Sequence, residues 1–226
     1  MRGLGLCRIL IEAGIDAPLS KWPPIAQVGK TIAARRRFFR SQEHVDSIPI
    51  ICDGWAAVAE FLPNGRRQIL SFLLPGELLS SSTLFESCVD HDVEALTPIC
   101  YRLFDRAGLW ERLVTDPKAL SSFVNDCAEE KHRLDELVLD LGRRKAHQRI
   151  ARLILELMDR LARRSAVREP TFNFPLRQSQ IADATGVTAA YVNQVLKGFR
   201  GKRLIKLEKR SLTVLDVARL RRLIDE

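Results

Sequence analysis

The chain has 226 residues and is 46% hydrophobic, which is enough apolar material for the cores of two modest domains. No apolar run approaches the roughly 18 residues that would span a bilayer. The opening residues 1–10 are not followed by an apolar stretch with a small-residue cleavage site. We therefore expect a soluble, cytoplasmic protein with no membrane partner.

The formal net charge of +8 is unevenly distributed along the chain. Residues 1–140 contain 16 Lys and Arg against 20 Asp and Glu, a net charge of −4, whereas residues 141–226 contain 20 against 8, a net charge of +12. This split is typical of a basic DNA-binding half joined to a near-neutral sensing or assembly half. A solvated basic face without a partner is the alternative.

The cysteines are scattered, odd in number and without a Cys-x-x-Cys pair. Neither a disulfide framework nor a zinc or iron–sulfur site is therefore expected, and we expect no other metal site. Most of the thiols should be reduced and buried. The five cysteines are Cys7, Cys52, Cys88, Cys100 and Cys127.

The first 40 residues give weak structural signals. Residues 4–13 are weakly amphipathic and are followed by a Trp22-Pro23-Pro24 break. Residues 31–40 carry the cluster Arg35-Arg36-Arg37. We interpret this segment as an exposed charged strand, the alternative being a phosphate or nucleotide contact.

From residue 48 to residue 74 the apolar pattern has the period of strands. Residues 55–62 and 66–74 predict an antiparallel hairpin, in which Asn64-Gly65 supplies the positive φ values of the turn. Residues 93–104 predict another strand pair around Thr97-Pro98. Several short strands with Gly and Pro corners predict a small β-barrel or roll.

A helical pattern begins at Asp116 and contains a heptad seam. A seam of this kind usually faces a partner helix, and the simplest partner for a single such helix is its copy in a second chain. The alternative is a helix packed on its own β-domain. The predicted dimer interface consists of Leu120, Val124, Cys127, Lys131, Leu134, Val138 and Leu141.

Gly142 breaks this helix, and residues 143–164 predict a second one. Residues 165–174 are expected to form a linker, and residues 216–224 a final helix. The inner face of the second helix would consist of Ile150, Leu153, Ile154, Leu157 and Leu161.

Residues 176–197, LRQSQIADATGVTAAYVNQVLK, have the spacing of a helix-turn-helix. Gly186 lies at the turn, where a positive φ is unstrained only for glycine, and Thr188 is a natural N-cap of the second helix. Residues 204–207 and 211–215 predict the two strands of a wing with a basic tip. The alternative is an ordinary pair of core helices that touches no nucleic acid.

This order of roll, long helix, second helix, helix-turn-helix and wing resembles the Crp–Fnr superfamily of bacterial transcription regulators. The matching motifs are residues 64–77 (NGRRQILSFLLPGE), 93–102 (VEALTPICYR), 141–146 (LGRRKA) and the helix-turn-helix. The resemblance implies an α+β fold with an N-terminal cyclic-nucleotide-binding-like β-roll, a long dimerisation helix and a C-terminal winged helix-turn-helix. The corresponding domains are residues 1–115, 116–142 and 143–226.

Two departures from the family pattern concern the effector. In cyclic-nucleotide-binding members a Gly-Glu pair is followed by an arginine that meets the cyclic phosphate, but residues 78–92, which follow Gly76-Glu77, contain no arginine. A buried phosphate needs a paired cation, so cyclic AMP is not expected. The amino-terminal cysteine cluster of Fnr-like members is also missing, so an iron–sulfur cluster is not expected.

The roll could still take a small aromatic effector, a haem or no ligand. By resemblance, Cys88 and His91 lie in the loop that lines the pocket and are conceivable haem or metal ligands. Cys127 would face its copy across the seam, where an interchain disulfide is the alternative to an ordinary buried thiol. The pocket residues implied by the family are Gly76, Glu77, Leu78, Cys88 and His91.

The second helix of the helix-turn-helix would enter the major groove of DNA. Because this chain has Ala190 and Gln194 where many relatives carry a glutamate and an arginine, we expect a palindromic operator that differs from TGTGA or TTGAT half-sites and is richer in A·T. The resemblance assigns base contacts to Ala189, Ala190, Asn193 and Gln194. It assigns backbone contacts to Arg177, Gln178, Ser179, Thr188, Tyr191, Lys197, Arg200, Lys202, Lys209 and Arg210.

These expectations describe a homodimeric, sequence-specific transcription regulator of double-stranded DNA, controlled by a small effector other than cyclic AMP. RNA polymerase would be a further partner if the protein is an activator. The alternative is a constitutive DNA-binding or architectural protein with a ligand-free roll. An enzyme has little support, because no Ser-His-Asp set, phosphate loop or metal cluster stands out and the four histidines are dispersed.

Overall fold

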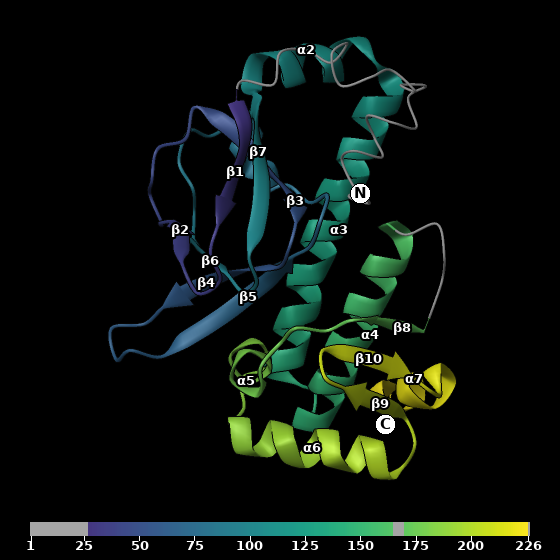
Figure 1. The fold of residues 1–226 in the computed structure, drawn as a ribbon. Helices are drawn as coiled ribbons and strands as arrows, with labels where there is room; N and C mark the ends of the chain where they lie inside the picture. The colour runs from purple at the N-terminus through teal and green to yellow at the C-terminus, as the bar shows by residue number, and fades with distance from the viewer. Residues whose placement is uncertain (1–26, 165–169, 226) are drawn as a thin grey trace. The chain divides into compact units, whose positions relative to one another are not determined.

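The computed structural model describes residues 27–164 and 170–225, which form two compact units. The first unit contains residues up to 60 together with 71–134, and the second contains residues 61–70 together with those from 135 onward (Figure 1). The weakly amphipathic segment 4–13 and the Trp22-Pro23-Pro24 break lie outside the described residues. No helix in the described part of the chain has the length and hydropathy of a membrane span.

Seven strands form the predicted roll as two sheets. The first sheet has the order β1-β7-β3 and the second the order β2-β6-β4-β5. The strands are β1 (Gln27–Ile32), β2 (Arg37–Phe39), β3 (Ser47–Asp53), β4 (Ala56–Phe61), β5 (Arg67–Leu73), β6 (Asp92–Ala95) and β7 (Ile99–Asp105).

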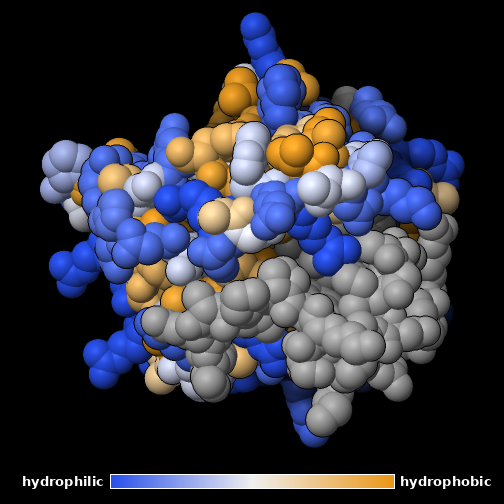
Figure 2. Space-filling view, turned by 90° about the horizontal axis from the view of Figure 1, so that it is seen from above, coloured by the Kyte–Doolittle hydropathy of each residue, from blue (hydrophilic) through white to orange (hydrophobic). Residues whose placement is uncertain are grey.

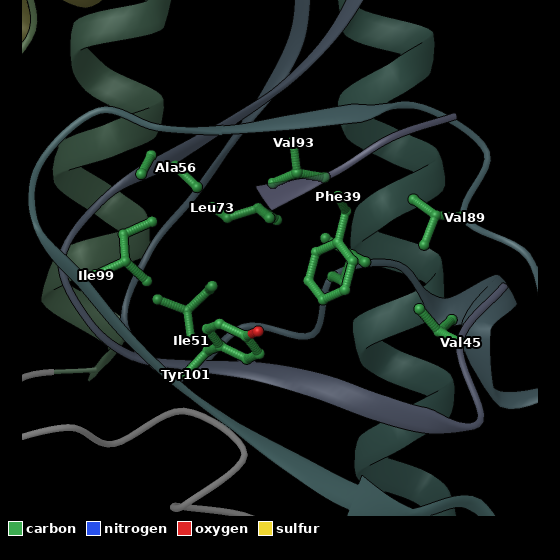
Figure 3. Packing of buried hydrophobic residues seen from close by; sticks show 11 residues of the cluster. Phe39, Val45, Ile51, Ala56, Leu73, Val89, Val93, Ile99 and Tyr101 are labelled. Carbon is green, nitrogen blue, oxygen red and sulfur yellow. The ribbon is translucent and has the colours of Figure 1, made fainter. Parts of the chain in front are cut away.

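Apolar side chains from both sheets fill the interior of the roll. Figure 3 shows Phe39, Ile51, Val93, Ile99 and Tyr101 directed into one shared core. Ile51, Val93 and Ile99 are at most 1% exposed, and the rings of Phe39 and Tyr101 meet edge to face at 5.7 Å. Because this interior is packed with hydrocarbon and aromatic groups, burial of its apolar surface is the main force that closes the roll.

The arginine cluster lies mainly in a turn, which corrects the prediction of a strand. Arg35 lies between β1 and β2 with a φ of +66°, and only Arg37 belongs to β2. The Arg37 guanidinium pairs with Asp92 at 3.0 Å. The repeated charge favoured an exposed strand, but the left-handed backbone at Arg35 ends β1 and reverses the chain.

The hairpin of β4 and β5 is confirmed, but its turn uses a single positive φ. Gly65 has a φ of +78°, whereas Asn64 does not adopt a positive φ. The Asn64 side chain instead accepts a hydrogen bond from the Arg66 amide at 3.0 Å. This three-residue geometry needs a left-handed residue only at the glycine.

The two strands around Thr97-Pro98 are present, but they do not pair with each other. β6 pairs with β2 and β4, whereas β7 pairs with β1 and β3. Thr97 forms the corner between the sheets, because its hydroxyl accepts a hydrogen bond from the Trp55 amide at 2.8 Å. Pro98 has no amide hydrogen to donate, which favours this crossing over a hairpin.

The described part of the first unit also contains helices. They are the short 3₁₀ helix η2 (Ser81–Leu84), α2 (Arg106–Thr115) and α3 (Pro117–Gly142), which continues into the second unit. The helical region therefore begins before Asp116, which was predicted as its start. Asp105 caps α2 by accepting from the Gly108 amide at 2.6 Å, and Asp116 separates α2 from α3.

Some apolar side chains of the first unit remain on its surface. Phe85 and Trp110 meet at 5.8 Å and are 65% and 51% exposed, and Val114 is 67% exposed. Figure 2 looks down on the side where α2 lies in Figure 1 and shows apolar side chains between hydrophilic ones. Phe123 beneath Phe85 is buried, so α3 contributes one face to the core of this unit.

The second unit contains the helix-turn-helix and the wing. Leu157, Val192, Leu212 and Leu220 are completely buried in its interior, and Ile181 is 2% exposed. Its elements are α4 (Ala146–Arg164), β8 (Thr171–Asn173), α5 (Gln178–Thr185), α6 (Ala189–Gly201), β9 (Ile205–Glu208), β10 (Ser211–Val214) and α7 (Val217–Asp225).

Strand β8 corrects the predicted linker. Part of the predicted segment lies outside the described residues, but Thr171–Asn173 pairs with β10 in a sheet of order β8-β10-β9. Phe172 lies opposite Leu212, and its ring meets that of Phe174 edge to face at 6.0 Å. The alternating aromatic pair therefore adds a third strand to the wing.

Candidate nucleic-acid interface

The turn between α5 and α6 has the geometry that the sequence predicts. Gly186 ends α5 with a φ of +64°, and its amide donates to the Ala182 carbonyl. A Cβ at this position would lie 3.0 Å from Leu141 Cδ2, so both conformation and space favour glycine. The Thr188 hydroxyl accepts from the Tyr191 amide at 3.2 Å and caps α6.

Helix α6 has one buried and one exposed face. Val192 and Leu196 are at most 3% exposed and face α5 and the core, so the opposite face meets solvent. The four predicted base-contacting residues, Ala189, Ala190, Asn193 and Gln194, all lie on the exposed face, as do Tyr191 and Lys197. These residues are therefore accessible from solvent, and their contact with DNA stays a prediction.

Asn193 is oriented by a residue of α5. The Gln178 amide nitrogen donates to Asn193 Oδ1 at 3.2 Å, which leaves the Asn193 amide hydrogens directed to solvent. An oriented carboxamide in the major groove suits adenine, which presents one acceptor and one donor. Gln178 was predicted as a backbone contact, and its positioning role was missed because the two residues lie in different helices.

The start of α5 and the tip of the wing supply exposed polar and basic groups. The Arg177 amide donates to the Gln180 side chain at 2.8 Å, which fixes the first turn of α5 and leaves Arg177, Gln178 and Ser179 on the surface. Lys209 and Arg210 form the two-residue tip between β9 and β10 and are exposed, with Lys209 at a φ of +54°.

Most basic groups of this surface are free to pair with an anion. Among the described residues no carboxylate lies within 4.0 Å of Lys197, Arg200, Lys209 or Arg210, whereas Lys206 pairs with Glu208 at 3.0 Å. A phosphate backbone would supply the missing negative charges. Two further exposed arginines, Arg219 and Arg222 on α7, were missed, although their spacing of three residues places them on one helix face.

The predicted seam runs along the exposed side of α3. Val124 is 55% and Val138 71% exposed, and Leu120, Leu134 and Leu141 are each above 40%. Ala119 and Phe123 on the other face are buried in the first unit. Helix α3 thus packs on its own domain through one face and leaves an apolar stripe uncovered, which is the arrangement that a dimer helix requires.

Cys127 lies at the edge of this stripe. It is half-buried against the core of the first unit, and Lys131 of the seam is exposed. Burial raises the pKa of the Cys127 thiol, and the nearby carboxylates of Glu130 and Asp126 act in the same direction. The thiol is therefore held in its protonated, weakly reactive form.

The predicted pocket residues of the roll are engaged in local structure. Gly76, with a φ of +86°, and Glu77 exchange backbone hydrogen bonds with Ile51. The Glu77 carboxylate is 8% exposed and accepts from the Leu74 amide at 2.8 Å. Leu78 forms a β-bridge with Ile50. The first half of the pocket is therefore a buried turn.

The second half of the pocket is a loop held by hydrogen bonds from Arg106 of α2. The Arg106 guanidinium donates to the carbonyls of Thr83, Val45 and Glu86 and to the Ser87 hydroxyl. The backbone of Cys88 bridges to His44, and His91 Nδ1 lies 3.1 Å from Glu60. In the part of the chain that the structure describes, no three His, Cys, Asp or Glu side chains are grouped to hold a metal ion.

This donor set does not fit a cyclic phosphate. The loop supplies no arginine of its own, and the nearby Arg106 already donates to four groups of the protein. A phosphate bound against the described residues of this loop would therefore find no arginine of the loop to pair with.

Comparisons with known proteins agree with both units. A family model described as "Crp-like helix-turn-helix domain" matches residues 148–223, and one described as "Cyclic nucleotide-binding domain" matches residues 30–116. The transcriptional activatory protein AadR of Rhodopseudomonas palustris is 29% identical over 97% of this chain and 88% of its own length. The transcriptional activator protein FnrL of Cereibacter sphaeroides is 28% identical over 80% of this chain and 73% of its own length. The structure of FixK2 from Bradyrhizobium japonicum matches with a TM-score of 0.73 and 24% identity, over 87% of this chain and 96% of that one.

An exposed recognition helix with a basic wing, joined to a β-roll and a long helix, defines a DNA-binding regulator of transcription. Matches to both domains and to relatives along nearly the whole chain identify the family. The chain belongs to the Crp–Fnr superfamily.

Proposed function

We propose that two copies of this regulator associate through the exposed seam of α3 and bind a palindromic operator with their α6 helices. The single observation that supports this most strongly is that the same chain exposes two surfaces, an apolar stripe on α3 and a polar face on α6. A dimer places two recognition helices about 34 Å apart, one turn of DNA. Both surfaces are exposed in the described part of the chain.

The residues on α6 favour an operator richer in A·T than the TGTGA or TTGAT half-sites. Ala189 and Ala190 offer methyl groups, which suit the thymine methyl, and Asn193 and Gln194 offer carboxamides, which suit adenine. The surrounding backbone contacts would come from Arg177, Gln178, Ser179, Thr188, Tyr191, Lys197, Arg200, Lys209 and Arg210.

Selection of binding sites from random duplexes tests this reading. We expect a palindrome with A·T pairs at the positions that face Asn193 and Gln194. The matched variant Ala190→Glu/Gln194→Arg should move the selected half-site toward C and G, because these side chains pair with cytosine N4 and guanine O6 and N7. Recovery of TGTGA or TTGAT by the unmodified protein would contradict the proposal.

We infer further that a small effector other than cyclic AMP controls operator binding. The turn at Glu77 and the loop held by Arg106 would transmit the effector's presence to α3, since Glu130 of α3 accepts from the Ser81 amide at 3.1 Å. Operator affinity is to be measured at fixed salt with reductant, cyclic AMP, haem and small aromatic acids. Affinity that no compound alters would instead indicate constitutive binding, and a response to cyclic AMP alone would contradict the inference.

A further inference from the structure

A pocket of about 320 Å³ lies at the C-terminal end of α6. Leu204, which is 1% exposed, and Leu223 contribute apolar surface. Lys202, Arg219 and Arg222 surround it. All five residues belong to the second unit, and none of them has a base-reading role in the function proposed above.

The positive charges around this pocket are not neutralised by the protein. In the described ranges, 27–164 and 170–225, no carboxylate lies within 4.0 Å of Lys202, Arg219 or Arg222. The nearest arginine on the same helix behaves differently, because Arg221 pairs with Asp159 at 3.4 Å. Three unpaired cations that converge on one cavity are repelled by one another and are stabilised by a bound anion.

The backbone around the pocket is fixed. Asp216 accepts from the Arg219 amide at 2.8 Å, which anchors the first turn of α7. The Lys202 amide donates to the Gly198 carbonyl at 3.0 Å, and the Leu204 amide to the Phe199 carbonyl at 2.9 Å. The cations therefore project from two rigid elements, so little backbone order would be lost when a ligand binds.

The length of α6 relates this pocket to bound DNA. Its 13 residues span about 20 Å, whereas the major groove is about 12 Å wide. When the first turns of α6 lie in the groove, its last turn reaches past the groove edge, and in Figure 1 α7 lies on the side of this last turn. A phosphodiester backbone offers anionic oxygens to the three cations.

We propose that Lys202, Arg219 and Arg222 bind backbone phosphates of DNA beside the half-site that α6 reads. The inference rests on the proposed function and adds a contact outside the base-reading surface. If these contacts form, the protein binds the DNA backbone outside the palindrome. Affinity then depends on the length of the flanking duplex as well as on the operator sequence.

The test compares the full-length protein with its Arg219→Ala/Arg222→Ala variant on two duplexes. One duplex ends at the outer edges of the selected palindrome, and the other extends about one helical turn, roughly 10 base pairs, on each side. The unmodified protein should bind the longer duplex more tightly. The double variant should lose this gain, about 5- to 20-fold, and change the affinity for the short duplex less than about twofold.

Arg221→Ala is the matched control, because Arg221 lies on the same helix, is 59% exposed and has a carboxylate partner. It should keep the gain, and thermal unfolding should show that all variants fold. The slope of log affinity against log salt should become shallower by about one to two for each protomer in the double variant only. A double variant that keeps the gain, or that weakens both duplexes equally, would overturn the inference.

A failure of operator recognition can be distinguished from a failure of the phosphate contact. If no palindrome is selected, that function is contradicted, and the same variants are compared on a long duplex of random sequence. There, a salt slope that is shallower in the double variant than in Arg221→Ala supports a phosphate contact at the pocket. An unchanged slope overturns it.

Discussion

The first turn of α6 depends on one hydroxyl group. Thr188 accepts a hydrogen bond from the Tyr191 amide at 3.2 Å, and among the described residues it is the side chain that caps this helix end. Because the amides at a helix start have no partner within the helix, loss of the cap leaves one of them to water. The same turn carries Ala189 and Ala190, so the cap also fixes the residues proposed to meet thymine.

Thr188→Ala should therefore lower the free energy of unfolding by about 1 kcal/mol, which corresponds to a Tm shift of roughly 2–4 °C for a chain of this size. The measurement is thermal unfolding followed by circular dichroism. Thr188→Ser keeps the oxygen and should restore most of the loss. Equal destabilisation by the serine and alanine variants would show that the methyl group, rather than the cap, is responsible.

The Cys127 thiol should ionise at higher pH than an ordinary thiol. Burial is the largest cause of its raised pKa; the hydrogen bond with Ser81 is the next largest and lowers the pKa, and the charges of Glu130 and Asp126 raise it further. The thiolate is the reactive form, so the rate of alkylation by iodoacetamide should rise with pH and reach half of its maximum only above the ordinary pKa of 9.0. Mass spectrometry of the Cys127 peptide across pH gives the midpoint.

The raised pKa of Cys127 also determines how the free energy of unfolding changes with pH. Since the folded state holds this proton more tightly than the unfolded chain, the stabilisation is present below the ordinary thiol pKa and is lost as pH rises through the raised value. Cys127→Ser should remove this alkaline loss. A midpoint at or below 9.0 would show that the buried thiol is not disfavoured as an anion.

At the scale of elements, a network of buried ion pairs connects the end of α3 to α4. Asp140 is 3% exposed and accepts from Arg144 Nη1 at 2.8 Å and from Arg152 Nε. Glu156 joins the network through Arg152 at 3.1 Å and Arg160 at 3.0 Å. A buried pair adds little net stability over apolar packing, but removal of Asp140 takes away the most buried carboxylate of the network and leaves Arg144 with Glu136 at 2.7 Å and Arg152 with Glu156 at 3.1 Å.

Asp140→Ala should consequently destabilise the protein by about 3 kcal/mol, the lower end of the loss for a broken buried pair, because Arg144 and Arg152 would keep only the more exposed carboxylates of Glu136 and Glu156. Urea unfolding measures the change. Asp159→Ala is the control, since Asp159 is 46% exposed and pairs with Arg221 on the surface, and it should cost less than about 1 kcal/mol. Similar losses in the two variants would place the Asp140 network in solvent.

The elements that could be predicted from the sequence are those with a local physical signature. Gly186 and Thr188 mark the helix-turn-helix because one needs a positive φ and the other a cap, and both signatures are local. The seam on α3 follows from a repeat. Strand β8 and helix α2 were missed because the short run Thr171–Asn173 is stabilised only by β10, and Asp105 begins α2 directly at the end of a strand.

The features that could not be predicted from the sequence depend on contacts between residues far apart in the chain. The strands around Thr97 were predicted as a pair, yet each joins another sheet, because pairing partners are chosen by the whole roll. Within the second unit, Arg67 at the β4–β5 turn pairs with Asp183 of α5 at 2.6 Å, although 116 residues separate them. No local pattern encodes such a pair. The same applies to Gln178 and Asn193, whose contact needs the angle between two helices.

For the whole molecule, the separation of charge along the chain assigns different tasks to its halves. The part up to residue 140 has a net charge of −4 and carries most of the apolar seam, whereas the part from residue 141 has a net charge of +12 and carries the interface for DNA. A dimer doubles the basic surface without bringing it into the seam. Two half-site contacts then act together, since binding of the first raises the effective concentration of the second.

Val138→Glu tests this coupling directly. Val138 is 71% exposed, so the substitution should leave the protomer folded, but a second copy would have to bury the new carboxylate in the seam. Sedimentation should show monomers at micromolar concentration, and affinity for the full operator should fall at least about 100-fold, toward that for a single half-site. Leu139→Glu changes a neighbouring side chain that is 47% exposed but lies outside the heptad seam. This control should remain dimeric, and a Val138→Glu protein that binds as tightly as the control would show that the copies do not meet along α3.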